Sequence, residues 1–305
     1  MLPARGTFAG VVGFLKTASI ALLFFLQGVR LERAAIIQGM THWRLQLLTL
    51  TSTFVLFPLL GFALYLSVPG FLSESLWIGV LFLCALPSTV QSSIAFTSIA
   101  RGNVPAAVCA ATASNLLGIV ITPLLVAMLL KRHSDISPLA QIEQIVVQLL
   151  VPFIAGQIAG RWLRPWVRRH SSILSLTDRG SIVLVVYSAF SAAAIAGAWS
   201  ALKPIELGKI LGLSALLLAI VLLFTRFTSR ALGFAKADEI AVVFCGSKKS
   251  LVTGVPMANI LFPASVVGLV ILPIMMFHQL QLMVCAFLAR RYAQRKEVDS
   301  GSIAA

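Results

Sequence analysis

The chain has 305 residues, of which 59% are hydrophobic and 11% are charged, and its mean hydropathy is +0.96. A soluble domain has roughly 45–50% apolar and about 25% charged residues, so this composition excludes a soluble globular protein and indicates a chain that uses lipid as solvent. The net charge of +14 would also suit a nucleic-acid-binding protein, but the positions of the basic residues, given below, indicate membrane topology instead.

Nine apolar runs, separated by short polar clusters, are each long enough to cross the hydrocarbon core as a helix of about 20 residues. Stretches such as LVVYSAFSAAAIAGAW (184–199) lack the polar–apolar alternation of a membrane β-barrel. We therefore predict an all-α polytopic membrane protein with one domain, 1–305, and nine spans. The predicted spans are 10–29, 45–66, 76–100, 104–130, 142–163, 180–199, 207–225, 238–260 and 264–289.

The first run is not a cleavable signal, because Arg30 and Arg33 follow it, whereas a signal peptide has its charges before the apolar region. If the C-terminus is cytoplasmic, sixteen Lys and Arg residues lie in inside segments and five in outside segments. This bias predicts a cytoplasmic C-terminal tail, 293–305. The basic and aromatic stretch RWLRPWVRRH (161–170) is typical of a juxtamembrane anchor, and the alternative is an RNA-binding patch.

The third run contains a proline followed by polar residues, in LCALPSTVQSSIAFTSIARGN (83–103). Pro87 lacks a backbone donor and crowds the preceding turn, so we expect the helix to break there. Open backbone at membrane depth is tolerated only where it is buried in protein or lines a water-filled cavity. The clustered polar residues are Ser88, Thr89, Gln91, Ser92 and Ser93.

The eighth run contains two adjacent lysines near its middle, in FCGSKKSLVTGVP (244–256). On insertion scales two central lysines cost roughly 5–7 kcal/mol. One interpretation is that both snorkel to an interface, since lysine stems are long. Lys248 lies about ten residues from each predicted end of its span, however, so we expect a break after Gly246. There at least one of Lys248 and Lys249 faces an anionic substrate or a cluster of carbonyl groups.

Interrupted segments in corresponding places of two halves indicate the binding site of a secondary transporter. The eighth run offers Ser247, Lys248, Lys249 and Ser250 to such a site, in addition to the five polar residues of the third run. Ser114 and Asn115, in the next span, are candidates to complete the shell around a substrate or ion, and interhelical hydrogen bonding is an equal alternative.

Other features favour structural roles. The four cysteines all fall within spans without a CxxC pair, so we expect small buried residues and neither a disulfide frame nor a metal site. GQIAG (156–160) is the small-xxx-small pattern of closely packed helices. Asp238 and Glu239 are interpreted as partners of a helix N-terminus. HExxH, Walker A and GxSxG motifs are absent, so we predict neither an enzyme nor a cofactor.

Four stretches resemble the bile acid:sodium symporter superfamily, and more narrowly its SBF-like bacterial branch. The resemblance covers essentially the whole chain, and FCGSKKSL is its most specific part. It implies a bacterial cytoplasmic-membrane protein with ten spans in two inverted five-helix repeats, whose fourth and ninth helices are broken and cross near the substrate and cation sites. The stretches are PSTVQSSIAFTSIARGN (87–103), ATASNLLGIVITPLLVAML (111–129), KADEIAVVFCGSKKSLVTGVPMANILFP (236–263) and HQLQLMVCAFLARR (278–291).

This chain departs from the family pattern in two ways. The first repeat, 1–133, has one helix fewer than the second, 140–292. We expect that the start of this sequence omits an upstream helix, the alternative being a real loss. Sodium-coupled members have a glutamate and amides at the ninth-helix break, where this chain has Phe244 and then the two lysines. A fixed ammonium there would itself supply the charge of the cation, so sodium coupling is not expected.

The sequence therefore predicts a secondary transporter of a small organic anion, with either Na⁺ or H⁺ as the conceivable coupling ion and with no nucleic-acid partner. Two other classes stay open. A regulatory or scaffold membrane protein would need no polar cavity. A membrane-embedded enzyme would need an acid–base pair, and the predicted spans have no carboxylate near their middle.

Overall fold

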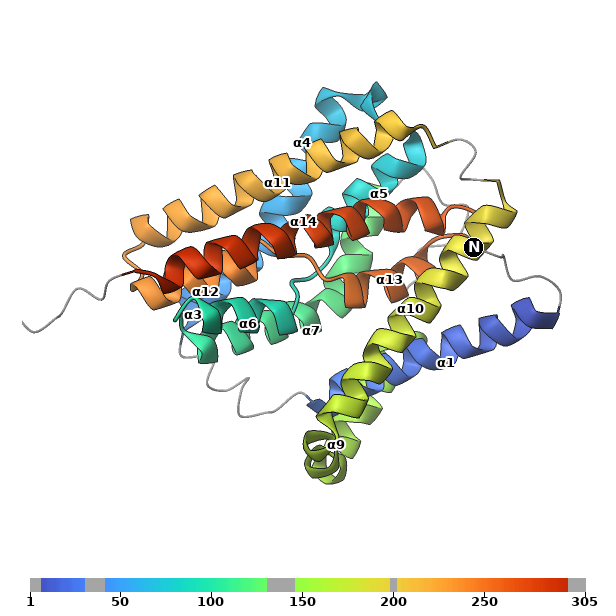
Figure 1. The fold of residues 1–305 in the computed structure, drawn as a ribbon, viewed down its shortest axis with the longest axis horizontal. Helices are drawn as coiled ribbons and strands as arrows, with labels where there is room; N and C mark the ends of the chain where they lie inside the picture. Colours follow the sequence, from blue (N-terminus) through green and yellow to red (C-terminus); the bar gives the residue numbers. More distant parts are fainter. Residues whose placement is uncertain (1–6, 31–41, 131–145, 198–201, 296–305) are drawn as a thin grey trace, which may run out of the picture.

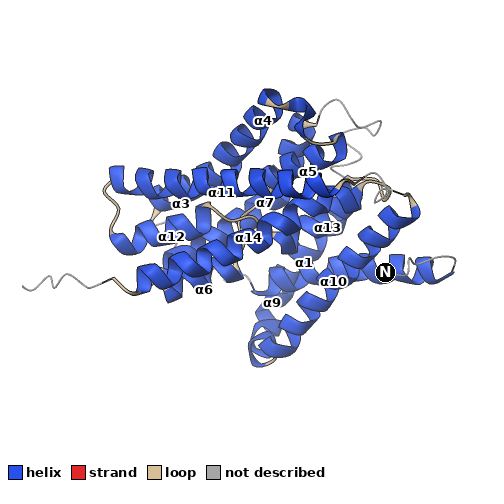
Figure 2. Ribbon diagram, turned by 45° about the horizontal axis from the view of Figure 1, so that its top comes forward, coloured by secondary structure: helices blue, strands red, loops and turns tan. Residues whose placement is uncertain are grey.

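The structure is a computed structural model that describes residues 7–30, 42–130, 146–197 and 202–295, and every regular element in these ranges is a helix (Figures 1 and 2). This confirms the all-α class. The elements are α1 (Thr7–Arg30), α3 (Trp43–Thr51), the π-helical η1 (Ser52–Leu56), α4 (Phe57–Ser67), the short η2 (Pro69–Phe71), α5 (Glu74–Ala85), α6 (Gln91–Ile99), α7 (Val104–Leu129), the π-helical η3 (Val146–Leu150), α9 (Val151–Arg169), α10 (Ser171–Ile195), α11 (Pro204–Ala231), α12 (Lys236–Gly246), α13 (Leu251–Leu261) and α14 (Val267–Ala293).

Seven helical stretches of the described chain are long and apolar enough to cross a membrane, and α5 is a shorter apolar helix. Their outward faces are apolar: on α11, for example, Leu223 and Phe227 are 53% and 62% exposed, as expected for side chains in contact with lipid. The chain is thus a polytopic membrane protein. The predicted count of nine spans stays a prediction, because the remaining two ranges contain the broken pair α5 and α6 and the arginine-rich α9.

Both predicted helix breaks are confirmed. The third run divides into α5 and α6, with 86–90 between them, and the eighth into α12 and α13, with 247–250 between them. Pro87 explains the first break, since it cannot donate a backbone hydrogen bond. The second break begins directly after Gly246, the C-terminal residue of α12.

The helices α1 and α9 lie together at one side of the molecule, and α10 extends from them to pack against α13 and α14 of the larger group, which contains the two broken helices (Figure 1). Glycines allow α1 and α9 to approach closely. A Cβ atom at Gly156 would overlap the Phe25 carbonyl, and one at Gly28 would overlap the Phe153 carbonyl. The interpretation of GQIAG as a close-packing motif is therefore confirmed.

The arginine-rich segment between the fifth and sixth predicted spans is helical, which differs from the prediction. α9 continues to Arg169 and α10 begins at Ser171. The apolar run ends at the arginines, but arginine favours helix almost as strongly as leucine. Hydropathy therefore placed the end of α9 too early and the start of α10 too late. Trp162 and Trp166 on α9 are 67% and 51% exposed, consistent with the predicted anchor at the membrane interface.

Hydrogen bonds between helix ends show which ends share a face. Arg44 donates to the Leu232 carbonyl, and Arg295 donates to the carbonyls of Ala100 and Arg101. All five positions belong to segments that the charge distribution assigns to one side. At the opposite end, the Lys209 ammonium donates to the Phe71 carbonyl and the Ser73 N–H donates to Glu206. The predicted tail beyond Arg295, and Arg5, Arg33, Lys131 and Arg132, lie outside the described residues.

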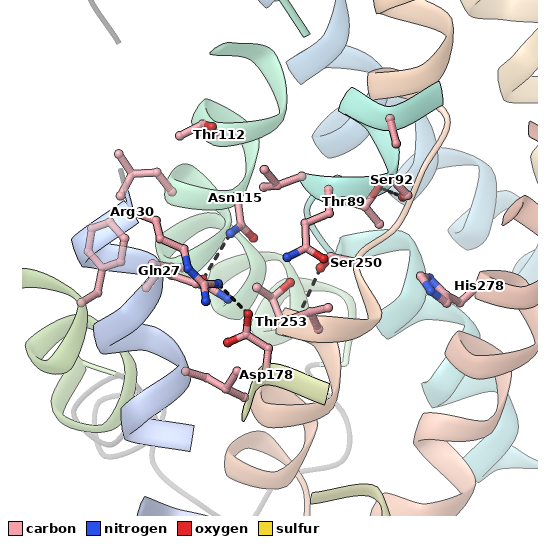
Figure 3. Close-up of a pocket in the computed structure, with 18 of the residues that line it drawn as sticks. Gln27, Arg30, Thr89, Ser92, Thr112, Asn115, Asp178, Ser250, Thr253 and His278 are labelled. Atoms are coloured by element: carbon pink, nitrogen blue, oxygen red, sulfur yellow. Dashed lines mark hydrogen bonds and ion pairs between the residues drawn. The ribbon is translucent and has the colours of Figure 1, made fainter. Parts of the chain in front are cut away.

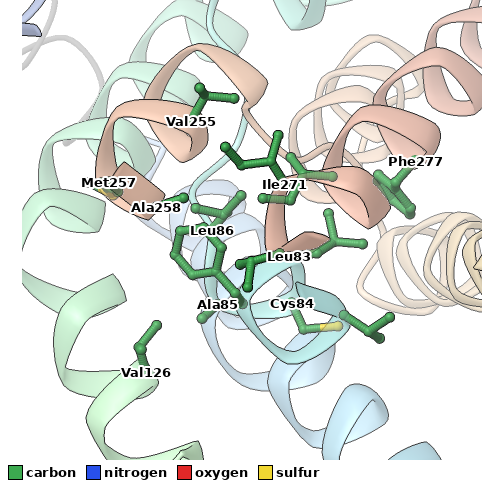
Figure 4. Packing of buried hydrophobic residues seen from close by; sticks show 14 of the residues in the cluster. Leu83, Cys84, Ala85, Leu86, Val126, Val255, Met257, Ala258, Ile271 and Phe277 are labelled. Atoms are coloured by element: carbon green, nitrogen blue, oxygen red, sulfur yellow. The ribbon is translucent and has the colours of Figure 1, made fainter. Parts of the chain in front are cut away.

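The main hydrophobic core surrounds the first break and supports its geometry (Figure 4). The end of α5 is fully buried there, and side chains from α13 and α14 pack against it. Because interiors of this kind are close-packed, the break is held in one position by its surroundings. The labelled members of this cluster are Leu83, Cys84, Ala85, Leu86, Val126, Val255, Met257, Ala258, Ile271 and Phe277.

Candidate functional site

A cavity of about 600 Å³ lies where the two breaks meet α1, α7, α10 and α14 (Figure 3). Its apolar walls include Leu23 on α1, Ile119 on α7 and Phe153 on α9. A mostly apolar cavity with a few convergent polar groups is the usual form of a small-molecule site. The polar lining residues are Gln27, Arg30, Thr89, Gln91, Ser92, Thr112, Asn115, Asp178, Ser250, Thr253 and His278.

Two helix N-termini open onto this cavity. Gln91 and Ser92 are the first residues of α6. Ser250 is the N-cap of α13, and its hydroxyl accepts a hydrogen bond from the Thr253 N–H at 3.3 Å. The N-terminus of a helix has a partial positive charge and unpaired N–H donors, so two of them favour an anion between them.

An ion pair and an amide pair line the α1 side of the cavity. The Arg30 Nη1 lies 2.5 Å from Asp178 Oδ2 on α10, and Asn115 Nδ2 on α7 donates to Gln27 Oε1 at 3.3 Å. Three buried polar atoms in the lining have no hydrogen-bond partner among the described residues: Asn115 Oδ1, Asp178 Oδ1 and Thr253 Oγ1. Buried polar groups are nearly always paired, so these atoms are free to bind a ligand or water.

Sequence reasoning missed six of the polar lining residues: Gln27, Arg30, Thr112, Asp178, Thr253 and His278. Both Arg30 and Asp178 fall between the predicted spans, because one apolar run ends before Arg30 and another begins after Asp178. The available signal was a carboxylate close to a span, which marks a functional site when it lies within the membrane. It becomes visible only when the helix boundaries are known.

Serine hydroxyls satisfy the carbonyls at the C-terminal end of α12. The last four carbonyls of a helix have no partner within the helix. Ser247 donates to the Val243 carbonyl at 2.6 Å, Ser93 to Phe244 at 3.0 Å, Ser88 to Cys245 at 2.5 Å and Ser52 to Gly246 at 3.0 Å. Three of these four serines were predicted substrate ligands, and in this structure their hydroxyls support the break instead.

The carbonyls at the end of α5 are satisfied differently. Ala85 accepts from the Thr122 hydroxyl on α7 at 2.9 Å, and Pro87 accepts from the Ser250 N–H at 2.9 Å. The second contact joins the two breaks directly. Ser114, another predicted ligand, accepts from the Ser88 N–H at 3.0 Å, which corresponds to the interhelical hydrogen bond that was its alternative role.

Lys249 donates to two further carbonyls at this end of α5 and to one carbonyl of η1. Its Nζ atom lies 2.7 Å from both the Cys84 and Leu86 carbonyls and 2.8 Å from the Thr53 carbonyl. Lys248 donates to the Ser92 carbonyl at 2.8 Å. Both lysine side chains are 0% exposed. Snorkelling to an interface is therefore excluded. Lys249 faces a cluster of carbonyls, as one of the two expectations had it, whereas Lys248 has a single carbonyl partner.

The predicted ligands thus divide into residues that line the cavity and residues whose side chains hold the two breaks. Neither lysine lines the cavity, so direct contact between a lysine and a substrate stays a prediction that the geometry does not favour. Asp238 accepts from Asn103, and Glu239 pairs with Arg230 and Lys236. No group of three potential metal ligands occurs within the described ranges. The predicted residues that line the cavity are Thr89, Gln91, Ser92, Asn115 and Ser250.

Comparisons with known proteins show which family the chain is similar to. A model of the SBF-like CPA transporter family matches residues 1–294. The chain is 54% identical to an uncharacterized protein of Pseudomonas aeruginosa, over 99% of this chain and 91% of that protein. It is 52% identical to the putative symporter YfeH of Escherichia coli, over 97% and 89%. It is 28% identical to the sodium/bile acid cotransporter 7-A of Xenopus laevis, over 87% and 78%.

Proposed function

The chain belongs to the SBF-like CPA transporter family, and from this membership we propose that it is a secondary transporter of a small organic anion in the bacterial cytoplasmic membrane. The proposed mechanism is alternating access, in nine spans arranged as two inverted repeats, 1–133 and 140–292. The paired helix breaks and the cavity between them support this mechanism over a scaffold protein, which needs neither.

The observation that supports an anion is the convergence of two helix N-termini, those of α6 and α13, on one cavity. In transporters with discontinuous helices these positive ends point at the anionic group of the substrate. The Arg30–Asp178 pair is neutral as a unit, so it does not offset the positive potential of the two helix ends. The apolar walls, such as Leu23 and Phe153, suit the organic part of the substrate.

The arrangement of the helices supports rigid-body movement. The cavity lies between the group α1, α9 and α10 and the group with the broken helices, and both contribute lining residues. Its α1 and α10 residues, from Leu23 to Arg30 and Asp178, lie near the helix ends that the charge distribution assigns to the cytoplasm. We assign this conformation to the inward-facing state.

Transport in reconstituted liposomes tests the proposal. A thermal-stability screen of the purified protein first identifies binders among bile acids, shorter carboxylates, sulfonates and matched neutral and cationic analogues. Counterflow of the labelled binder is then measured in liposomes. We expect stabilisation by anions only, and saturable counterflow that Thr253→Val reduces at least tenfold, because this substitution removes a lining polar group and keeps the shape.

A matched control is Met283→Leu, since Met283 on α14 is 65% exposed on the outer face. It should leave counterflow unchanged. Preferential binding of cationic analogues, or equal counterflow by the parent and Thr253→Val proteins, would contradict the proposed site and the sign of its charge.

A further inference from the structure

The ammonium group of Lys249 lies in a cage of three backbone carbonyls and one aromatic ring. The carbonyls are those of Thr53, Cys84 and Leu86, and the Phe57 ring centroid lies 4.2 Å from Nζ. Lysine has three N–H donors and no acceptor. Each donor therefore has one carbonyl partner, and the ring faces the remaining side of the charge.

The backbone of Lys249 is held as firmly as its side chain. Gln281 on α14 accepts from the Lys249 N–H at 2.8 Å and donates to the Lys249 carbonyl at 2.9 Å. Gln281 is itself fully buried. Lys249 thus links the break before α13 to three other elements, namely η1, the C-terminal end of α5, and α14.

The acceptors of this cage have the chemistry of a monovalent-cation site. The Cys84 and Leu86 carbonyls belong to the C-terminal end of α5, which has a partial negative charge. Unwound carbonyls and half-helix C-terminal ends are the groups that coordinate small cations in transporters with broken helices. No carboxylate belongs to the cage, so its charge matches one ammonium or one alkali ion.

The end of α12 shows that a helix break does not require a charge. There four serine hydroxyls, those of Ser52, Ser88, Ser93 and Ser247, satisfy the same kind of carbonyls without any cation. An ammonium group at the end of α5 is therefore not something that every helix break needs. Its neighbour Lys248 is equally buried but has one carbonyl, that of Ser92, and the rings of Phe96 and Phe244.

We propose that Lys249 is a tethered cation, whose ammonium fills a monovalent-cation site formed by the carbonyls of Thr53, Cys84 and Leu86. The parent protein then needs no free cation at this place. Shortening the side chain uncovers a latent site for ammonium, an alkylammonium or an alkali ion. The consequence for transport, which is independence from sodium, rests on the proposed function, whereas the cation site does not.

Chemical rescue of a shortened side chain tests the site without any substrate. Lys249→Ala removes three carbons and the nitrogen, which n-propylammonium replaces. The thermal unfolding midpoint is measured in detergent at constant ionic strength with choline, sodium, ammonium or n-propylammonium as the cation. We expect the Lys249→Ala midpoint in choline to lie roughly 5–10 °C below the parent, and n-propylammonium to restore at least half of the loss saturably.

Lys249→Met is the matched control, because it removes the charge and fills the space. It should lose stability and show no rescue by any cation. The parent should show no saturable difference between sodium and choline, a result that does not depend on the variants folding. Saturable stabilisation of the parent by sodium, or equal Lys249→Ala midpoints in n-propylammonium and choline, would overturn the proposal.

The transport measurement is kept separate from this result. In liposomes, anion counterflow by the parent should proceed at the same rate with sodium and with choline. A sodium requirement would contradict the tethered cation. If no anion is transported at all, the proposed function fails, while the stability measurements still decide whether Lys249 occupies a cation site.

Discussion

At the residue scale, the polar side chains of the two breaks have two different tasks. Ser88 is buried and donates to the Cys245 carbonyl, whereas Ser92 lines the cavity and bonds the Thr89 hydroxyl at 2.7 Å. The two residues are four positions apart in the chain and were equivalent candidates in the sequence. Only the side of the backbone on which each hydroxyl lies distinguishes a cap from a ligand.

This difference predicts opposite effects of two alanine substitutions. Ser88→Ala leaves a buried carbonyl without its partner, so we expect the free energy of unfolding to fall by about 1–3 kcal/mol. Ser92→Ala should change stability little and lower counterflow of the organic anion. Thermal unfolding and counterflow of both variants check this, and a Ser88→Ala protein as stable as the parent would contradict the capping role.

The Arg30–Asp178 pair predicts a coupling between two residues that are distant in sequence. Arg30→Gln or Asp178→Asn alone leaves one charge unpaired in a partly buried place, where Asp178 is 7% exposed. We expect each single variant to be less stable, and the double variant to recover part of the loss, with an interaction energy of about 0.5–3 kcal/mol. Strictly additive losses in a double-mutant cycle would show that the two charges do not interact.

Sequence patterns predicted where the helices break but not how the breaks are held. Pro87 and the polar cluster after it identify a position that a regular helix cannot tolerate. Which hydroxyl meets which carbonyl depends on the other break, more than 150 residues away, as in the contact between Ser93 and Phe244. The tertiary partners of an irregular backbone have no local signal in one sequence.

At the element scale, the packing of α1 against α9 depends on glycine. The approach of the two backbones at Gly156 leaves no room for a Cβ atom beside the Phe25 carbonyl, whereas a Cβ at Gly13 on α1 would meet no atom within 4 Å. Small residues at such crossings let helices in lipid pack closely.

Two glycine-to-alanine substitutions should therefore change the thermal unfolding midpoint in opposite directions. Gly156→Ala should separate α1 from α9 and lower the thermal midpoint, despite the better helix propensity of alanine. Gly13→Ala should keep or raise the midpoint, since alanine is favoured over glycine in helices by about 1 kcal/mol. Unfolding curves of both variants in detergent check this; a neutral Gly156→Ala would show that the interface adjusts.

At this scale, the ends of the helices were the feature hardest to predict from the sequence. The transition from α9 to α10 has only His170 between two helices, where hydropathy predicted a long polar segment. Arginine and tryptophan end an apolar run without ending a helix. Asp178 was overlooked for this reason.

At the scale of the whole molecule, the contacts between helix ends agree with the sidedness predicted from charge. Arg44, Arg101 and Arg295 take part in contacts at one end, and Phe71 and Lys209 meet at the other. The number of basic residues then decides which end faces the cytoplasm. The general class could be predicted from composition, because a chain this apolar has few alternatives to a helical membrane protein.

Reporter fusions test the orientation. A fluorescent reporter after Ala305 should be active in the cytoplasm, and alkaline phosphatase inserted at Gly70, in an exposed turn next to Lys209 and Phe71, should be active in the periplasm. The reverse pattern would invert the topology and place the cavity in an outward-facing state.

The central claim is that the cavity between the two breaks is the pathway of an organic anion, and covalent blocking of the cavity tests it most directly. Ser92→Cys introduces a thiol into the lining, and Met283→Cys introduces one on the outer face, while the four native cysteines are buried. Both variants are treated in proteoliposomes with a negatively charged thiol reagent, and counterflow is measured against the extent of labelling. We predict that labelling of Ser92→Cys abolishes counterflow and is slowed by the transported anion, whereas labelling of Met283→Cys has no effect. Full labelling of Ser92→Cys with undiminished counterflow would contradict the account.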